Sequence, residues 1–228
     1  MAIILQIETA TQSCSAAIAI DGKTIAVKEQ VAQNIHAGSL TLFIEEVMLQ
    51  ASLGYVKLDA ISVSMGPGSY TGLRIGVSTA KGLCFALDKP LIAIDTLKMM
   101  ASGYLEENPD YQGLICPMID ARRMEVFSAI YDNDLVLQLS VDARIITSDS
   151  FSETLEQNKI AFIGDGAMKC AEVLKNNNAA FFGENYNSAT NMSKLAYQNF
   201  LGENFVDVAY FEPYYLKDFV LTPAKKKV

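Results

Sequence analysis

Two short acidic loops carry side chains that are suited to holding a phosphate or a metal ion. Glu8, Thr9 and Thr11 follow the first predicted strand and combine a carboxyl group with two hydroxyls. In the second half of the chain, Asp120 follows another predicted strand. Acidic and hydroxyl side chains of this kind, placed on facing loops, can hold a nucleotide phosphate and its metal between two lobes. These two loops are therefore the first candidates for chemistry.

Both loops depart from what phosphate binding requires. A glutamate at position 8 is longer than an aspartate and would displace a metal or water that it positions by more than roughly 1 Å. Asp120 is followed by alanine and then by Arg122 and Arg123, so side chains stand where backbone amides should approach a phosphate closely. The sequence predicts an altered first loop and a lost second one. Asp120, Arg122, Arg123 and Glu125 either form a polar site between lobes or flank a tight hairpin.

A glycine-rich stretch links a predicted strand to a predicted helix. It reads Gly66-Pro67-Gly68-Ser69-Tyr70-Thr71-Gly72-Leu73-Arg74-Ile75-Gly76. It has neither the Gly-Lys-Ser/Thr ending of a P-loop nor the third glycine of a dinucleotide-binding fingerprint. It also lacks the two flanking glycines that a nucleophile elbow places around its serine. Ser69 or Thr71 is instead predicted to cap the following helix, with Gly66, Pro67 and Gly68 shaping the loop.

Two helices in the first half carry more small or apolar residues than a single core needs. Gly72, Gly76 and Ala80 recur at every fourth position of the second helix and predict a groove that another helix could approach closely. An interior glycine otherwise costs roughly 1 kcal/mol relative to alanine.

The first helix has a second apolar set besides its main stripe. Leu42, Leu49 and Leu53 point away from that stripe, which indicates either a helix buried within its own lobe or a docking surface built from both helices. With Arg74 and the small residues of the second helix, these leucines are the candidate partner-binding residues.

The single histidine gives little support for a catalytic or metal site. His36 begins the first predicted helix, and Leu40 occupies the position where a metal-binding helix would carry a second histidine. A Ser–His or Cys–His pair would have to recruit His36, with Ser39 or Cys14 as the nucleophile. A hydrogen bond at the helix start is the simpler use. We therefore assign no catalytic residue and no metal ligand.

Composition limits the class of protein. The 228 residues are 50% hydrophobic, which is enough for a sizeable core. The net charge of −8 opposes direct binding to nucleic acid, so any RNA is expected to be held through a partner. The four cysteines lack CxxC spacing, and we find neither a basic leader nor an apolar run of about 20 residues. A cytoplasmic protein without membrane contact is expected.

The elements that must position these residues occur twice in the same order. The first half predicts strands at 3–8, 15–20, 24–30, 60–64 and 90–94, with helices at 35–53, 73–87 and 97–105. The second half predicts strands at 113–119, 124–131, 135–141 and 160–163, a weak strand at 179–182, and helices at 151–155, 167–175 and 193–201. Two copies of one unit predict an α/β protein with two lobes, residues 1–108 and 109–228. The last helix could pack on the first lobe.

Five motifs in order resemble the TsaB family, also called YeaZ. They are the glycine-rich stretch, the Ile7-Glu8-Thr9-Ala10-Thr11 start, His36, Ile119-Asp120-Ala121-Arg122-Arg123, and Glu212-Pro213-Tyr214-Tyr215-Leu216-Lys217. Glu8 stands in place of the family's usual aspartate, and Lys217 in place of its commoner arginine. The resemblance implies an actin-like (ASKHA, ribonuclease H-like) fold with lobes of βββαβαβα type.

The resemblance also implies a function. A TsaB-like protein is a non-catalytic subunit that binds TsaD, the enzyme that transfers threonylcarbamoyl to adenosine 37 of tRNA. The ATPase TsaE is the third member, and ATP is used by the complex, with no cofactor assigned to this chain. The metal-binding motif HxxxH of TsaD is absent, because Leu40 occupies the position of its second histidine, four residues after His36. Two other possibilities stay open: an M22 glycopeptidase-like hydrolase or small-molecule kinase of the same fold, and a homodimer formed through the two helices.

Overall fold

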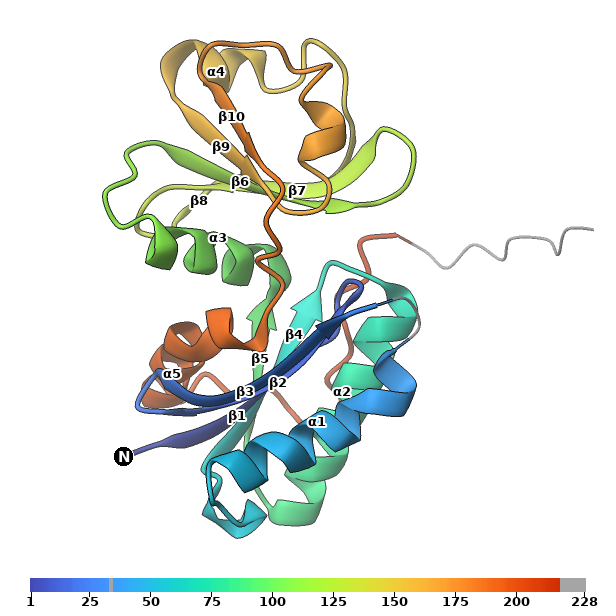
Figure 1. Ribbon diagram of the computed structural model, residues 1–228, viewed down its shortest axis with the longest axis vertical. Helices are drawn as coiled ribbons and strands as arrows, with labels where there is room; N and C mark the ends of the chain where they lie inside the picture. Colours follow the sequence, from blue (N-terminus) through green and yellow to red (C-terminus); the bar gives the residue numbers. More distant parts are fainter. Residues whose placement is uncertain (33–34, 218–228) are drawn as a thin grey trace, which may run out of the picture.

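The computed structural model describes residues 1–32 and 35–217. Its two five-stranded sheets lie one above the other, and helix α3 (Thr96–Glu107) runs between them (Figure 1). None of the helices in the described part of the chain is long and apolar enough to span a membrane.

The first sheet has the strand order β3-β2-β1-β4-β5. Its strands are β1 (Ile3–Glu8), β2 (Ser13–Ile20), β3 (Lys23–Val31), β4 (Ala60–Gly66) and β5 (Leu91–Asp95). The first three form an antiparallel meander, and β4 and β5 run parallel to β1. Asp21 and Gly22 turn the chain between β2 and β3 with positive φ angles of 49° and 78°, as an Asp-Gly hairpin requires.

Helices α1 (His36–Gln50) and α2 (Tyr70–Leu87) cover one face of this sheet (Figure 1). The predicted stripe on α1 is confirmed, because its buried positions follow helical spacing: Leu40, Phe43, Ile44, Val47 and Met48. They pack with the inward side chains of β1, β2 and β4 to form the core of the first lobe.

The second sheet repeats the topology of the first. Its elements are β6 (Leu114–Asp120), β7 (Glu125–Tyr131), β8 (Leu137–Ile145), α4 (Ser152–Gln157), β9 (Ile160–Ile163) and β10 (Ala179–Phe182). The order β8-β7-β6-β9-β10 matches β3-β2-β1-β4-β5 strand for strand. The predicted duplication is confirmed, and the weakly predicted strand at 179–182 is present.

The prediction of a helix over residues 167–175 is wrong. Only a 3-10 turn, Met168–Cys170, forms there, and the following backbone bonds join residues three or four apart without making an α-helix. The segment is shorter than the roughly 12 residues that support an isolated helix, and three asparagines follow it. Lys169 also turns its side chain toward the β6–β7 loop.

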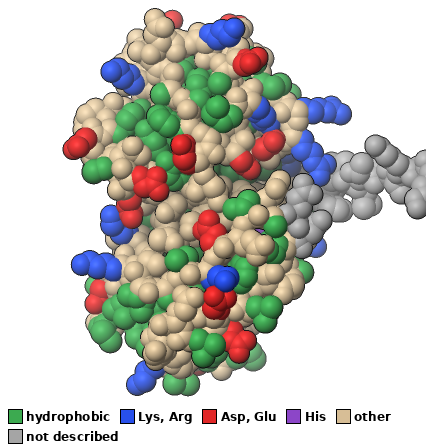
Figure 2. Space-filling view, viewed as in Figure 1, with side chains coloured by type: hydrophobic (Ala, Val, Ile, Leu, Met, Phe, Trp, Pro, Cys, Tyr) green, Lys and Arg blue, Asp and Glu red, His purple; other side chains and the backbone are tan. Residues whose placement is uncertain are grey.

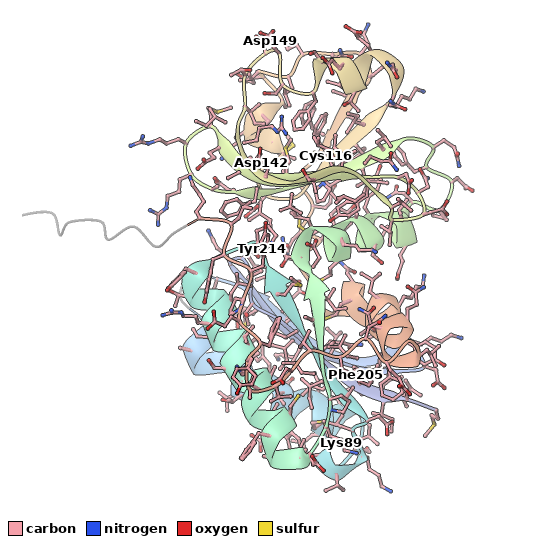
Figure 3. The ribbon with its side chains drawn as sticks, turned by 180° about the vertical axis from the view of Figure 1, so that it is seen from behind. Lys89, Cys116, Asp142, Asp149, Phe205 and Tyr214 are labelled. Atoms are coloured by element: carbon pink, nitrogen blue, oxygen red, sulfur yellow. The ribbon has the colours of Figure 1, made fainter. Side chains whose placement is uncertain are left out.

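The chain returns to the first lobe before it ends. Helix α5 (Ser193–Leu201) packs against β1, β3 and β5, and the Val206 backbone pairs with Leu91. In the view from behind, Phe205 lies low on the first lobe and Tyr214 lies near the level where the lobes meet (Figure 3). Residues 205–217, the C-terminal strap, therefore run along the first lobe and reach the second lobe at Lys217.

Candidate functional site

Ser69 begins helix α2 as its N-terminal cap. Its backbone is extended, and its hydroxyl oxygen accepts a hydrogen bond from the Gly72 amide at 3.3 Å. The predicted cap is confirmed at Ser69, whereas Thr71 is exposed on the first turn. The loop is thus built to start a helix.

The glycines of the loop touch carbonyl groups of the chain itself. A Cβ atom at Gly66 would overlap the carbonyl oxygen of Tyr214, and one at Gly68 would overlap that of Ala10. The Ala10 oxygen also accepts a hydrogen bond from the Ser69 amide at 2.6 Å. Carbonyl oxygens repel a phosphate, so the loop is not arranged to bind one. These glycines instead permit close packing of backbone on backbone.

The prediction of a docking groove along α2 is wrong. Gly72, Gly76 and Ala80 are buried, and a Cβ atom at either glycine would overlap Thr9 of the β1–β2 loop. The Thr9 hydroxyl donates to the Gly72 carbonyl at 2.8 Å. The two glycines make room for a loop of the same lobe, and Ala80 is part of the first core, so these three residues offer no surface to another protein.

The outer surface of α1 carries two exposed leucines, with the exposed Glu45 between them. Leu42 and Leu49 are 60% and 72% exposed, and they lie two helical turns apart on one side of α1. Leu53 differs from the prediction, because it lies just beyond α1 and packs partly buried against the first core. On the neighbouring α2, Phe85 is 86% exposed. The sequence analysis missed Phe85, because the apolar run around it resembles a core segment.

Arg74 lies on the exposed side of α2 between two aromatic rings. Its guanidinium carbon is 4.2 Å from the centre of the Tyr70 ring, and its Nε donates to the Tyr215 hydroxyl at 3.1 Å. The C-terminal strap therefore holds Arg74 beside the start of α2.

Glu8 is fully buried at the end of β1. Its Oε1 accepts a hydrogen bond from the Ala10 amide at 2.5 Å. Burial raises the pKa of Glu8 to about 7, which the Ala10 amide and the Ser64 hydroxyl partly oppose and the charge of Glu29 reinforces. The carboxyl group therefore lies in the interior of the first lobe, bonded within its own loop.

The neighbouring hydroxyls of this loop are also used within the lobe. The Thr11 hydroxyl accepts from the Ser13 amide at 3.2 Å, and Thr9 contacts α2 as described above. The ring of His36 bonds to the Ser13 carbonyl through Nε2 at 3.1 Å. Among residues 1–32 and 35–217, no group of three acidic, histidine or cysteine side chains is arranged to hold a metal ion.

The second loop is a tight hairpin between β6 and β7. Asp120 Oδ1 accepts from the Arg122 amide at 2.7 Å and from Lys169 Nζ at 2.6 Å. Lys169 also donates to the carbonyls of Arg123 and Glu125, both at 2.7 Å. Arg122 and Arg123 have positive φ angles of 72° and 49°. The sequence left two interpretations of Asp120, Arg122, Arg123 and Glu125: a polar site between lobes, or charges that flank a tight hairpin. The geometry matches the second.

The two candidate loops do not share a hydrogen bond or ion pair in the described part of the chain. The C-terminal strap spans the lobes at this side, because Tyr214 donates its amide to the Met65 carbonyl at 2.7 Å and Lys217 pairs with Glu125 at 2.6 Å. The sequence analysis gave Lys169 no role, because it lies in the mispredicted helix.

Solved structures define the class of protein. A Pseudomonas aeruginosa protein described as similar to the peptidase YeaZ superposes with a TM-score of 0.84 at 24% identity, over 95% of this chain and 100% of that one. A polyphosphate/ATP-glucomannokinase from Arthrobacter superposes with a TM-score of 0.50 at 12% identity, over 89% and 100%. The fold is therefore the actin-like (ASKHA, ribonuclease H-like) α/β fold.

Sequence comparisons narrow this class to a family. Residues 23–220 match the family model described as TsaD: tRNA N6-adenosine threonylcarbamoyltransferase. The tRNA threonylcarbamoyladenosine biosynthesis protein TsaB of Bacillus subtilis is 30% identical over 71% of this chain and 70% of its own length. The TsaB of Haemophilus influenzae is 35% identical over 54% of this chain and 51% of its own. This chain belongs to the TsaB, or YeaZ, family, and it spans about half the length of the second relative.

Proposed function

We propose that this chain is a non-catalytic subunit that binds and activates a TsaD-type threonylcarbamoyltransferase in the cytoplasm. The complex would form N6-threonylcarbamoyladenosine at position 37 of tRNA. TsaE would be its third member and would use ATP, and tRNA would be bound only through the complex. The observation that carries the proposal is the exposed apolar surface of α1 and α2.

This surface is unusual for a monomer. Leu42, Leu49 and Phe85 are all largely exposed on two helices that pack side by side. Burying a leucine or phenylalanine side chain contributes about 1.5–3 kcal/mol, so three of them form a plausible centre for a protein interface. Figure 2 shows hydrophobic side chains at several points over the lower lobe, whose front carries α1.

The state of the two loops supports a subunit without its own chemistry. Glu8 is buried within the first lobe, and the Asp120 carboxylate is bonded to Lys169. The glycine-rich loop faces carbonyl oxygens. Burial of Glu8 and the bonds to one oxygen of each carboxylate argue against an M22 glycopeptidase-like hydrolase or a small-molecule kinase and for nucleotide handling by the partner subunits.

The proposal is tested by placing charges on the apolar surface. The double variant Leu42→Glu/Leu49→Glu should stay folded but lose at least about tenfold in affinity for a TsaD-type subunit, because it brings carboxylates into an apolar contact. Size-exclusion chromatography with light scattering would measure the complex. Leu201→Glu is the matched control, since Leu201 is 65% exposed on α5 and outside the surface.

Two results would overturn the proposal. The first is that the wild-type chain forms no complex even when TsaE and ATP are supplied. The second is that the double variant binds as tightly as the Leu201→Glu control.

In the absence of a partner, we propose that the same surface pairs two copies of this chain. Sedimentation of the wild type should then show a dimer at high concentration, and the Leu42→Glu/Leu49→Glu variant should remain a monomer. A wild-type protein that stays monomeric at high concentration would contradict this use of the surface.

A further inference from the structure

The β6–β7 hairpin displays two adjacent arginines whose side chains have no partner among the residues that the structure describes. The chain has four arginines: Arg74 lies over an aromatic ring, and Arg144 pairs with Asp142 at 3.8 Å. Arg122 and Arg123 are exposed, and their guanidinium groups make no ion pair, hydrogen bond or ring contact within residues 1–32 and 35–217. The two adjacent positive charges contrast with the net charge of −8 of the whole chain.

The carboxylates beside the turn are already occupied. Asp120 is bonded to Lys169, and Glu125 is paired with Lys217. Asp165 accepts from the Asp120 amide at 3.0 Å. Because other donors hold these acids, the charge of the two guanidinium groups is left for an anion from outside the chain.

The backbone of the turn holds the two arginines in an unfavourable conformation. Both have positive φ, which glycine and asparagine adopt far more readily than arginine. Lys169 stabilises the turn through its three hydrogen bonds, to the Asp120 carboxylate and to the carbonyls of Arg123 and Glu125. A strained conformation that the surrounding contacts enforce is a reason to look for a function in the side chains that it displays.

The surroundings favour a phosphodiester backbone over an acidic protein. Protein interfaces have a core from which charges are depleted and in which aromatic residues are enriched. The residues next to the arginines in the chain are exposed Asp120 and half-exposed Ala121 and Met124, and none of these three is an aromatic anchor. Guanidinium groups bind phosphates bidentately without an apolar surround. Lysine and arginine side chains also gather at the right-hand edge of the upper lobe (Figure 2).

We propose that Arg122 and Arg123 form a contact site for the phosphodiester backbone of an RNA that is held by the assembled complex. The inference rests on the proposed function, because the acidic chain alone would repel RNA at long range. Two contacts of this kind orient a nucleic acid without reading its sequence.

The test uses a variant that suits the turn better than the natural pair. Arg122→Asn/Arg123→Gly removes both charges and should raise the melting temperature, since Asn-Gly favours two positive φ angles. Binding of a fluorescein-labelled RNA stem-loop to the complex with a TsaD-type subunit would be measured by anisotropy at several salt concentrations. The variant should lose roughly tenfold or more in affinity, and its log–log salt slope should fall by about 1 to 2.

The control removes two charges elsewhere. Lys57→Ala/Lys89→Ala changes the net charge equally, and Lys89 lies at the far end of the first lobe (Figure 3). Its complex should bind RNA with the wild-type salt slope. Equal RNA affinity and slope for the Arg122→Asn/Arg123→Gly variant and wild type, with both complexes formed, would overturn the inference and leave the proposed function standing. Loss of the complex by that variant would place the arginines against protein and also overturn it. Absence of the wild-type complex would overturn both proposals.

Discussion

At the scale of single residues, Glu8 is the clearest case of a side chain whose surroundings change its chemistry. It lies in the loop that the sequence suggested for phosphate binding, yet its carboxyl group is buried and bonded to its own loop. Burial favours the protonated form, so the folded protein binds a proton there that the unfolded chain releases.

This buried carboxyl group should make stability depend on pH. The pKa of Glu8 rises from 4.5 to about 7 on folding, so its penalty is absent below the unfolded pKa and grows as pH rises to about 7. Glu8→Gln removes the penalty and should gain about 2–3 kcal/mol in unfolding free energy relative to wild type between about pH 5 and about pH 8. Urea unfolding at both pH values measures this. A difference between the two proteins that is the same at both would contradict the prediction.

At the scale of elements, helix α2 shows how one sequence pattern can serve two purposes. Gly72 and Gly76 lie against Thr9, whereas a Cβ atom added at Gly82 would meet open space. The first set permits a close approach between a helix and a loop. Gly82 contributes only the flexibility that glycine brings to a helix.

Alanine substitutions should separate these two kinds of glycine. Gly72→Ala would push a methyl group into the Thr9 carbonyl and should destabilise the protein by roughly 1–3 kcal/mol or more. Gly82→Ala meets nothing within 4 Å and should stabilise it by up to about 1 kcal/mol. Denaturant unfolding of both variants checks the contrast. Equal effects would mean that the Thr9 loop gives way easily and that the fit is not close.

At the scale of the whole molecule, the two lobes share one of their cores. Residues of α3, among them Met100 and Tyr104, pack with β5 of the first sheet and with Ile115 and Ile119 of the second. The hydroxyl of Tyr131 on β7 donates to Asp95, the cap of α3, at 3.1 Å. The lobes are therefore joined by buried apolar contacts as well as by the linker and the C-terminal strap.

The shared core should make the protein unfold in a single transition. Separating the lobes would expose the residues around α3 to water, so a state with one lobe unfolded should be poorly populated. Differential scanning calorimetry should give a calorimetric enthalpy equal to the van't Hoff enthalpy. Two resolved transitions, or a calorimetric enthalpy well above the van't Hoff value, would show that the lobes unfold independently.

Local signals in the sequence determined much of the architecture. The Asp21-Gly22 turn, the Ser69 cap, the α1 stripe and the bounds of α5 follow from preferences that act over a few residues, and the predictions at these places agree with the structure. The duplicated order of elements along the chain also follows, because each lobe repeats the same local pattern.

The surroundings of the candidate site were decided only by tertiary structure. Whether Gly76 faces a partner or Thr9 depends on a loop far away in the chain, and spacing within α2 is the same in both cases. The exposure of Phe85 and the bonds of Lys169 likewise depend on which segments lie beside them. Periodicity identifies a face of an element, but long-range packing determines what covers it.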